Sequence, residues 1–482
     1  MSLATSFRIL GILLMLFSTA MLPSLALAWL DQDNTITAFI DGFLITLLGG
    51  FLLWAPCAGA HSELRIRDGF FVTSLFWLVL GTFGAAPLWL APDLGLTLPA
   101  AIFESISGLT TTGATVLVGL DELPRSLLLY RQLLQWLGGI GIIVVAMAIL
   151  PMLGVGGMAL YRAETPGPSK DNKLTPRISG TALALFYVYI TLTLACALAY
   201  YLAGMNSFDA IGHAFSTVAI GGFSTHDASM GYFNNDSILW ISSLFMGIAA
   251  INFGLHFFAW KHKSLKGYAS DPETGFFLLC LTASIVVTCL ILLATKTLDP
   301  QESVVHGVFQ AVSMATTTGF TTTDFSSWPT FLPMMLILFS FIGGCVGSTG
   351  GGLKVMRVLL IVKQGLREMR QLIHPQAIIP LRVGGRRVDA AIVSAVWSFF
   401  AVYVIAFLMI LLLLMAMGLD FLSAFSAVAA SLNNLGPGLG DVSANYSTVS
   451  DHTKLVLAFT MLLGRLEVFT LLVLFTPMFW RR

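Results

Sequence analysis

Four short glycine-containing loops recur along the chain, each between two strongly apolar runs. An internal repeat constrains the architecture before any local structure is considered, because each copy is the same structural unit. We therefore expect four helix–loop–helix units arranged around one axis, with the glycine hairpins meeting at that axis. The loops read TTTGAT at 110–115, AIGGFS at 219–224, TTTGFT at 316–321 and NNLGPG at 433–438.

The composition indicates an all-α integral membrane protein. Of the 482 residues, 56% are hydrophobic and only 10% are charged, which is more apolar surface than a soluble domain can bury. A membrane helix needs about 20 apolar residues, and roughly ten transmembrane helices are predicted on this basis. The expected spans lie near 8–29, 37–57, 70–91, 126–153, 180–203, 237–260, 275–295, 330–360, 390–417 and 453–479.

Four further apolar segments are too short to cross a bilayer. Each follows a turn or cap signal and leads into one glycine loop, so we expect re-entrant half-helices, which are tolerated at membrane depth only when buried in protein or facing water. These segments are 97–110, 206–219, 301–316 and 419–433. The chain then divides into an N-terminal two-helix extension and four pore repeats, with bounds 1–62, 63–160, 161–265, 266–372 and 373–482.

The basic residues predict an orientation. If the hairpins open to one side, Lys and Arg should gather in the connections on the other side, which is the cytoplasm. Twenty of the 25 do so, and this places both termini in the cytoplasm and the hairpins outward. These twenty are Arg8, Arg65, Arg67, four in 162–177, three in 261–266, eight in 354–387, and Arg481 and Arg482.

The first span has an alternative interpretation as a cleaved signal peptide, since Arg8 precedes an apolar stretch that ends in Ala26-Leu27-Ala28. Cleavage would leave an odd number of spans and turn Arg65 and Arg67 to the wrong side, which argues against it. The five cysteines and eight histidines are scattered. They predict neither a disulfide framework nor a metal cluster.

Alignment of the loops on their glycines reveals two further shared positions. Six residues earlier stands a small residue, as expected where half-helices crowd together: Ser107, Ser216, Ser313 and Ala430. Five residues later, three copies carry a carboxylate where the first has Val118: Asp227, Asp324 and Asp441. A ring of carboxylates at an outer mouth concentrates cations. The alternative, in which each Asp caps or solvates a loop, stays open.

Glycine at the turn lets successive carbonyl groups point inward, because it adopts backbone angles that residues with a Cβ reach only under strain. Such carbonyls replace the water around a dehydrating cation, and the C-terminal end of each half-helix favours positive charge. Close helix packing is the structural alternative for any one glycine turn. Four turns in register favour a pore.

With these loops the chain resembles the Trk/Ktr/HKT superfamily of potassium transporters, and its two extra N-terminal spans resemble the membrane subunit of bacterial Trk systems. The resemblance implies potassium uptake across the bacterial inner (plasma) membrane, with Gly113 typical of potassium rather than sodium preference and the fourth loop the most divergent. The implied potassium ligands, mainly backbone carbonyls, are Thr111, Thr112, Gly113, Ile220, Gly221, Gly222, Thr318, Gly319, Leu435 and Gly436.

One span is interrupted by a glycine-rich stretch at 343–352, which cannot form a stable helix because each glycine costs up to about 1 kcal/mol relative to alanine. A close helix crossing is the alternative. The resemblance implies an intramembrane gate loop below the third filter loop, and Lys354 follows it. The expected gate residues are Gly343, Gly344, Cys345, Gly347, Ser348, Thr349, Gly350, Gly351, Gly352 and Arg465.

Two charges within the membrane need partners. Arg465 lies within the last span, where an ionisable residue costs roughly 3 kcal/mol and is a functional candidate. Glu467 lies two positions on and points elsewhere, and the resemblance implies that Arg465 reaches the gate loop. A structural ion pair or bonds to carbonyls of a neighbouring helix are equally compatible. Glu104 is expected to bind backbone or hydroxyl groups rather than an ion.

The basic stretch 354–387 is typical of a cytoplasmic anchor, and it could also dock a soluble partner. The resemblance implies a cytosolic nucleotide-binding regulatory subunit (TrkA-like) beneath a homodimer, while this chain has no nucleotide motif of its own. A proton- or sodium-coupled secondary carrier is the alternative function. Carriers usually contain inverted repeats, however, and these copies share one orientation. A membrane enzyme would need a catalytic cluster, and none stands out.

Overall fold

The computed structural model describes residues 3–60, 66–144 and 178–480. Apart from the two-residue strands β1 (Arg382–Val383) and β2 (Arg386–Arg387), the regular structure in this part is helical. The basic loop 162–177, Arg65, the last two arginines and the end of the expected span 126–153 lie outside the described residues.

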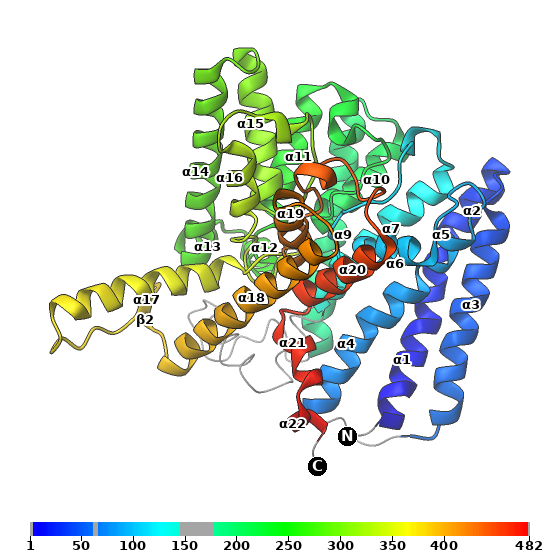
Figure 1. Cartoon of the computed structure of the whole chain (residues 1–482), viewed down its shortest axis with the longest axis horizontal. Helices are drawn as coiled ribbons and strands as arrows, with labels where there is room; N and C mark the ends of the chain where they lie inside the picture. Colours follow the sequence, from blue (N-terminus) through cyan, green and yellow to red (C-terminus); the bar gives the residue numbers. More distant parts are fainter. Residues whose placement is uncertain (1–2, 61–65, 145–177, 481–482) are drawn as a thin grey trace.

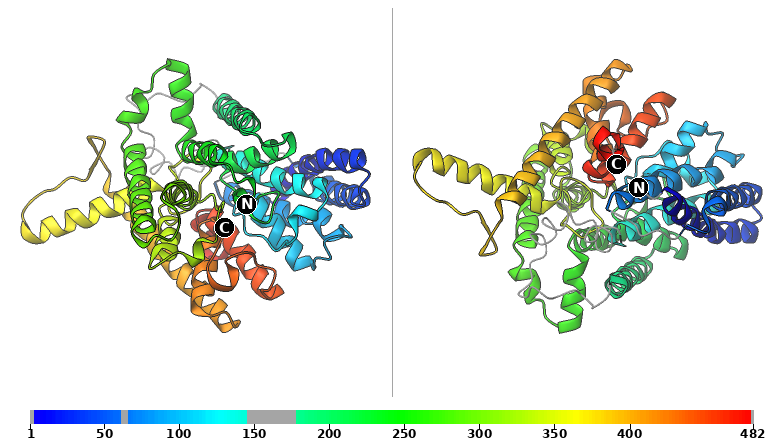
Figure 2. Two further views of the ribbon diagram at one scale, coloured as in Figure 1. Left: turned by 90° about the horizontal axis from the view of Figure 1, so that it is seen from above. Right: turned by 90° about the horizontal axis from the view of Figure 1, so that it is seen from below.

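The N-terminal extension is a helical hairpin at the edge of the molecule (Figure 1). It consists of α1 (Leu3–Ser18), α2 (Leu22–Asp31) and α3 (Ile36–Trp54). Glycines bring α1 and α3 into contact, since a Cβ on Gly11 would lie 2.6 Å from the carbonyl oxygen of Gly50. The view from above in Figure 2 places this hairpin outside the ring formed by the other helices.

All four short segments are half-helices, and they begin at the predicted caps. Thr97, Asn206 and Asp420 each accept a hydrogen bond from a backbone N–H in the first turn. Asp299 occupies the same position without a side-chain cap bond. The half-helices are α6 (Leu98–Leu109), α10 (Ser207–Ala219), α15 (Pro300–Ala315) and α19 (Phe421–Leu432).

Longer helices flank each half-helix and give the all-α membrane fold that the composition predicts. Six described spans are long and apolar enough to cross a bilayer, and two bent helix pairs bring the number to eight. Five long flanking helices are α4 (Ile66–Phe83), α7 (Arg125–Val144), α9 (Ile178–Leu202), α14 (Pro272–Thr295) and α18 (Ala390–Ala416), and the short α5 (Ala86–Leu90) completes the span that begins with α4. The bent pairs are α11 (Asp236–Ala249) with α12 (Phe253–His262), and α20 (Asp451–Arg465) with α21 (Phe469–Leu472) and Val473–Phe475.

These bends differ from the sequence-based expectation of continuous spans over 237–260 and 453–479. The chain turns by 94° between α11 and α12 and by 109° after α20. Asn252 starts α12 by accepting a hydrogen bond from the Gly254 N–H, and Glu467 and Val468 both have φ of 53°. The third-repeat inner segment is also interrupted, as predicted: α16 (Leu332–Phe339) and α17 (Val355–Ile373) flank the glycine-rich loop.

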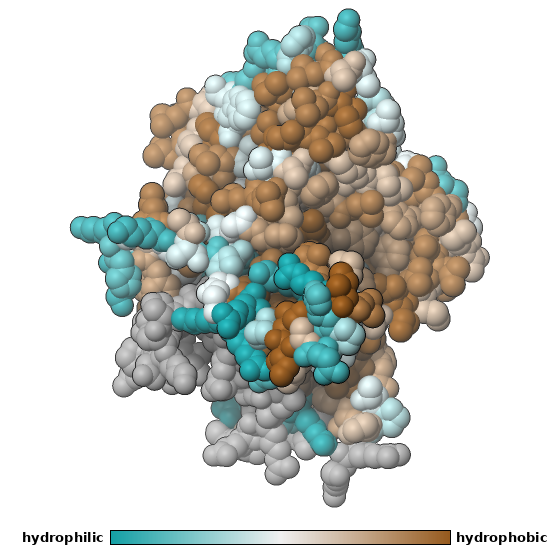
Figure 3. Space-filling model, turned by 90° about the vertical axis from the view of Figure 1, so that its left-hand side faces the viewer, coloured by the Kyte–Doolittle hydropathy of each residue, from teal (hydrophilic) through white to brown (hydrophobic). Residues whose placement is uncertain are grey.

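The helices surround a common centre, and α17 extends away from it together with the β1–β2 turn (Figure 2). The space-filling view in Figure 3 shows broad hydrophobic surface on the body of the molecule and a mixture of polar and apolar residues on the projecting part. Large apolar side chains on α18, such as Leu408, Met409 and Leu412, are exposed. A surface of this kind is suited to lipid rather than to water.

Candidate functional site

The four glycine loops end their half-helices in the same way. In each, the N–H of the residue before the aligned glycine donates to the carbonyl of the small residue five positions earlier, which closes the helix end. The donor–acceptor pairs are Thr112–Ser107 at 2.9 Å, and Gly221–Ser216, Thr318–Ser313 and Leu435–Ala430 at 2.8 Å. The carbonyl groups of the small residues that the alignment identified therefore accept the hydrogen bonds that close the half-helices.

The loops also share an unusual backbone conformation. Two positions in each have positive φ, and the first is never glycine, although such angles strain residues with a Cβ. The non-glycine residues are Thr111 (52°), Ile220 (55°), Thr317 (66°) and Asn434 (54°). The second positions are Gly113 (83°), Gly222 (80°), Gly319 (83°) and Gly436 (99°). The same strained turn has formed four times from four different sequences.

The aligned glycines form a closed ring in chain order. A Cβ built on each one would collide with the backbone of the next loop, and the fourth returns to the first. The carbonyl oxygens that it would meet are those of Gly221 (2.1 Å from Gly113), Thr318 (2.1 Å from Gly222), Leu435 (2.0 Å from Gly319) and Thr112 (2.6 Å from Gly436). All four loops therefore meet around one axis, with carbonyl groups between them.

The fourth loop is joined to the first by side chains that its divergent sequence provides. The amide of Asn434 donates at 3.0 Å to Thr112 Oγ1 and at 3.0 Å to the Met461 carbonyl on α20. Tyr446 donates its hydroxyl to the Gly436 carbonyl at 3.0 Å. NNLGPG thus retains the common backbone turn while replacing the threonine hydroxyls with amide contacts.

A buried ion pair supports the first and second loops from outside the ring. Arg131 on α7 is 1% exposed and lies 2.9 Å from the carboxylate of Glu104 on α6, which is fully buried. Glu104 also accepts from Thr115 Oγ1 and from the Val116 N–H, while Arg131 donates to the Ser224 carbonyl at 3.0 Å. As predicted, Glu104 binds backbone and hydroxyl groups, and its pairing with Arg131 was not foreseen.

The three predicted mouth carboxylates are all exposed, but two also accept a backbone hydrogen bond, in one case from the first repeat. Asp227 accepts from the Gly119 N–H at 3.0 Å, and Asp324 accepts from the Ser326 N–H at 3.1 Å. Asp441 binds through its own N–H to Ser423 Oγ at 2.9 Å. The loop-capping interpretation therefore applies to Asp227 and Asp324, and it is compatible with an acidic mouth.

The glycine-rich loop at 343–352 lies directly against three of the four repeats. The Gly351 N–H donates to Thr317 Oγ1 at 2.7 Å, and the Gly352 N–H donates to the Asn433 carbonyl at 3.1 Å. Thr349 Oγ1 donates to the Val218 carbonyl at 3.0 Å. A Cβ on Gly351 would lie 2.0 Å from the Asn433 oxygen, so this contact requires glycine.

Two basic side chains and one carboxylate also form hydrogen bonds with the backbone of this loop. Arg465 donates from Nη1 to the Thr349 carbonyl at 3.1 Å, and Lys354 donates to the Gly350 carbonyl. Glu273 on α14 accepts from the Val346 N–H at 2.8 Å and from the Met356 N–H at 3.2 Å. The loop is thus bound at several backbone positions.

Arg465 and Glu467 diverge, as their spacing predicts. Glu467 pairs with Arg357 of α17 at 2.6 Å, whereas Arg465 points to the glycine-rich loop. The Nε and Nη2 atoms of Arg465 are buried and have no hydrogen-bond partner in the part of the chain that the structure describes. A guanidinium with one hydrogen bond is held less firmly than one with five.

Sequence reasoning missed the polar face of α7 and the role of Glu273. Arg131, Gln132 and Gln135 are buried, and each contacts the backbone of the second loop. A signal was available, because polar residues one and four positions apart lie on one side of a helix in an otherwise apolar span. That signal does not reveal which loop they contact.

A histidine joins the first two repeats at the hairpin side. His226 lies 2.5 Å from Asp121 Oδ1 and 3.2 Å from Asp209 Oδ2, and its ring stacks on Tyr232 with centroids 3.4 Å apart. Burial alone would lower the pKa of His226, but the hydrogen bonds to Asp209 and Asp121 outweigh it and raise that pKa.

This cluster predicts a pH dependence. Because the folded-state pKa of His226 is raised, its stabilising contribution is full below the unfolded value of about 6.5 and is lost as pH rises through the folded value. The melting temperature of the purified protein should fall as the pH rises above about 6.5, and less steeply in His226→Gln. His452→Gln, at an exposed position, serves as the control. Equal slopes in all three proteins would contradict the prediction.

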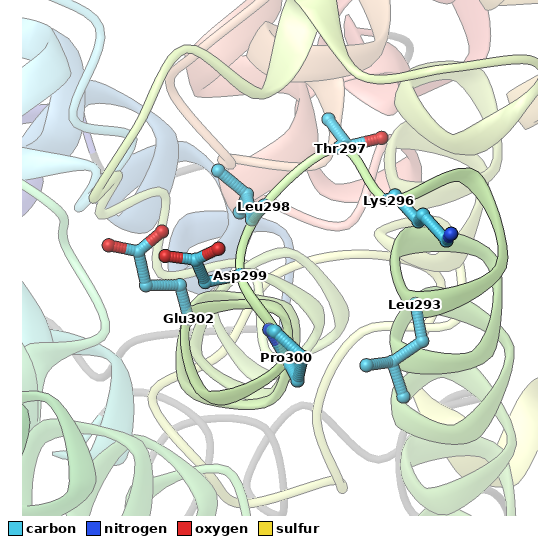
Figure 4. A pocket seen from close by; sticks show the side chains of 7 residues that line it. All are labelled: Leu293, Lys296, Thr297, Leu298, Asp299, Pro300 and Glu302. Atoms are coloured by element: carbon cyan, nitrogen blue, oxygen red, sulfur yellow. The ribbon is translucent and has the colours of Figure 1, made fainter.

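A surface depression of about 490 Å³ lies at the turn between α14 and α15 (Figure 4). Asp299 and Glu302 lie on one side of this segment, and Lys296 lies on the other. Its polar groups do not converge, and none of the lining residues belongs to the glycine loops or to the loop at 343–352.

Together, the apolar helices and the ring of re-entrant loops define a multi-pass protein of the membrane transport class. A family model described as TrkH, cation transport protein, matches residues 35–482, and the chain belongs to this family, which consists of transporters rather than enzymes. Membrane-spanning helices and bacterial relatives make it an inner-membrane protein.

Similar proteins match over nearly their whole length. The chain is 54% identical over 482 residues to the Trk system potassium uptake protein TrkH of Halomonas elongata, with 100% of both chains covered. It is 51% identical to the protein of that name from Escherichia coli K12, with 98% of both covered. The crystal structure of the potassium transporter TrkH from Vibrio parahaemolyticus matches with a TM-score of 0.93, 50% identity and 100% of both chains covered.

Proposed function

We propose that this chain takes up potassium across the inner membrane through a selective pore formed by its four glycine loops. The observation that carries the proposal is the closed ring in which each aligned glycine lies against a carbonyl of the next loop. Rings of backbone carbonyls replace the hydration shell of a monovalent cation. The relatives named as potassium uptake proteins support potassium as the transported ion.

The ligands in this proposal are mainly backbone carbonyls of the four loops. The ends of four half-helices, each with partial negative charge, add to the attraction for a cation. The hairpins face outward, both termini are cytoplasmic, and Asp227, Asp324 and Asp441 form an acidic outer mouth. The proposed ligands are Thr111, Thr112, Gly113, Ile220, Gly221, Gly222, Thr318, Gly319, Leu435 and Gly436.

The loop at 343–352 is the proposed gate. It contacts Thr317 and Asn433, which lie one and two positions before the first proposed ligands of the third and fourth repeats, and it also reaches Val218 in the second. A segment in this place obstructs an ion path along the axis. Arg465 holds it there through the Thr349 carbonyl.

Regulation by a cytosolic nucleotide-binding, TrkA-like subunit and assembly as a homodimer are further parts of the proposal. The projecting helix α17 supports both, because it carries basic residues together with exposed apolar ones. Leu366, Met369, Leu372 and Ile373 are 46%, 56%, 82% and 73% exposed. A helix with this composition offers a surface to a protein partner.

A proton- or sodium-coupled secondary carrier is the alternative. The broken helices and buried charges occur in carriers as well. The closed ring in chain order favours the pore, because it relates the four repeats by rotation about one axis rather than by inversion.

Rubidium flux into proteoliposomes tests the proposal. The purified wild-type chain with its cytosolic partner, or a variant with a weakened gate, should carry rubidium down its gradient. This flux should not require a proton or sodium gradient. Absence of flux under all of these conditions would refute the pore, and flux that requires a proton or sodium gradient would favour the carrier.

Gly113→Ser is expected to reduce the preference for rubidium over sodium by about tenfold or more, which corresponds to about 1.4 kcal/mol of discrimination. A Cβ at this position would lie 2.1 Å from the Gly221 carbonyl oxygen, so the ring must open locally. Rubidium and sodium fluxes into the same liposomes measure the ratio. Gly119→Ser, where a Cβ meets nothing within 4 Å although φ is also positive, is the matched control.

Arg465→Ala is expected to raise basal flux by about tenfold or more, because it removes the hydrogen bond to Thr349 from the gate. The loss of one hydrogen bond from a charged donor is worth about 1.5–3 kcal/mol. Flux without the cytosolic partner is the measurement. Unchanged flux in a folded variant would leave Arg465 with a structural role only.

A further inference from the structure

The second loop lacks the pair of threonine side chains that stabilises the first and third loops. In TTTGAT the hydroxyls of Thr110 and Thr112 lie 2.7 Å apart, and in TTTGFT those of Thr316 and Thr318 also lie 2.7 Å apart. In AIGGFS the equivalent positions are Ala219 and Gly221, which have no polar side-chain atom. The second loop nevertheless adopts the same turn, so its support must come from elsewhere.

That support comes from Gln135 on α7, which belongs to the preceding repeat. Its Nε2 donates to the Gly221 carbonyl at 2.6 Å, and its Oε1 accepts from the Phe223 N–H at 3.1 Å and from Ser216 Oγ at 2.5 Å. A backbone N–H only donates and a carbonyl only accepts, so these contacts define which amide atom is which. The side chain is fully buried and both of its polar atoms are used.

Gly221 provides the space that the amide occupies. A Cβ on Gly221 would lie 2.4 Å from Cδ and Oε1 of Gln135 and 2.8 Å from Nε2, and these are its three nearest neighbours. Gly221 is absent from the residues with positive φ, so its backbone angle does not require glycine. Glycine is needed at this position to make room for Gln135.

We infer that Gln135 is a positioning residue that braces the second loop in place of the missing threonine hydroxyls and sets the direction of the Gly221 carbonyl. The inference rests on the proposed function, in which that carbonyl is a potassium ligand. A donor at 2.6 Å from the oxygen engages one of its two lone pairs and restrains the peptide plane, which leaves one lone pair for the ion. Gln135 thereby tunes ion discrimination in one quarter of the ring.

Gln135→Met, which keeps the length of the side chain but none of its hydrogen bonds, is the first test. The ratio of rubidium to sodium flux should fall about tenfold, the effect of losing one to two buried hydrogen bonds, while gel filtration shows a folded protein. Gln310→Met is the matched control, because this glutamine on α15 is also fully buried and its amide atoms have no partner among the described residues. Its flux ratio should equal that of the wild type.

A second-site suppressor experiment distinguishes the space that Gly221 provides from the hydrogen bonds that Gln135 makes. Gly221→Ala alone should lose most of the flux because its new methyl group collides with the amide. Gly221→Ala combined with Gln135→Ala should recover flux relative to Gly221→Ala, at the reduced discrimination of Gln135→Ala. A general structural role for either residue predicts instead that the two defects add.

The outcomes distinguish this inference from the proposed function. If neither the wild-type protein with its partner nor the variants with a weakened gate carry rubidium flux, the proposed pore fails and the inference fails with it. If Gly113→Ser changes the flux ratio while folded Gln135→Met does not, the pore stands and the role of Gln135 is refuted. Failure of both Gln135→Met and Gln135→Ala to fold would also refute it, since it indicates assembly rather than tuning.

Discussion

Arg131→Ala is expected to abolish uptake and to destabilise the protein by about 3–5 kcal/mol, the usual cost of removing one partner of a buried ion pair. The Glu104 carboxylate would remain fully buried without its cation. Arg131 also spans two repeats, because it binds Glu104 behind the first loop and the Ser224 carbonyl at the end of the second. Its guanidinium lies 4.2 Å from the centre of the Phe223 ring, which adds a cation–π contact.

Thermal unfolding in detergent, followed by rubidium uptake in liposomes, measures both effects. Arg125→Ala is the control on the same helix, because Arg125 pairs with Asp31 at the surface and its side chain is 55% exposed. An exposed pair contributes about 0–1 kcal/mol. Equal melting temperatures for the two variants would mean that the Glu104–Arg131 pair does not stabilise the filter region.

Deletion of residues 345–351 is expected to raise basal flux by about tenfold or more, equivalent to lowering the barrier to conduction by about 1.4 kcal/mol. The deleted segment carries the contacts from Thr349 and Gly351 to the second and third repeats. It also carries the carbonyls that Arg465 and Lys354 bind. In the deletion variant Gly344 is joined directly to Gly352, and the connection from α16 to α17 is shorter.

Flux of rubidium without the cytosolic partner is the measurement for this deletion. Removal of Gly384 and Gly385, which form the turn between β1 and β2, is the control for shortening the chain beyond α17. Basal flux that stays the same or falls in a folded 345–351 deletion would be evidence against a gate in this loop.

The half-helices were predictable because each is specified locally. A cap residue, a short apolar run and a glycine turn lie within about 20 residues of one another, and α6, α10, α15 and α19 begin and end within two residues of the predicted bounds. The glycine-rich interruption before α17 was also readable, since it needs only the composition of one stretch.

The cross-repeat contacts were not predictable in the same way. Gln135 and Gly221 are 86 positions apart, and Arg465 and Thr349 are 116 apart. No local pattern specifies such pairs. The bends after Ala249 and Arg465 were missed because Asn252 is a single cap residue within an apolar run, and nothing in the sequence signals the positive φ of Glu467 and Val468. Glu467 tolerates its positive φ while it is paired with Arg357.

The closed ring of glycines is made by a single polypeptide, and this has an evolutionary consequence. A pore of four identical subunits repeats every substitution four times, so a change that suits one quarter is imposed on all of them. Here each quarter mutates independently. Threonine hydroxyls stabilise the first and third loops, a glutamine from the preceding repeat stabilises the second, and an asparagine stabilises the fourth. One gene can therefore adjust ion preference in small steps while the remaining three quarters keep the pore working.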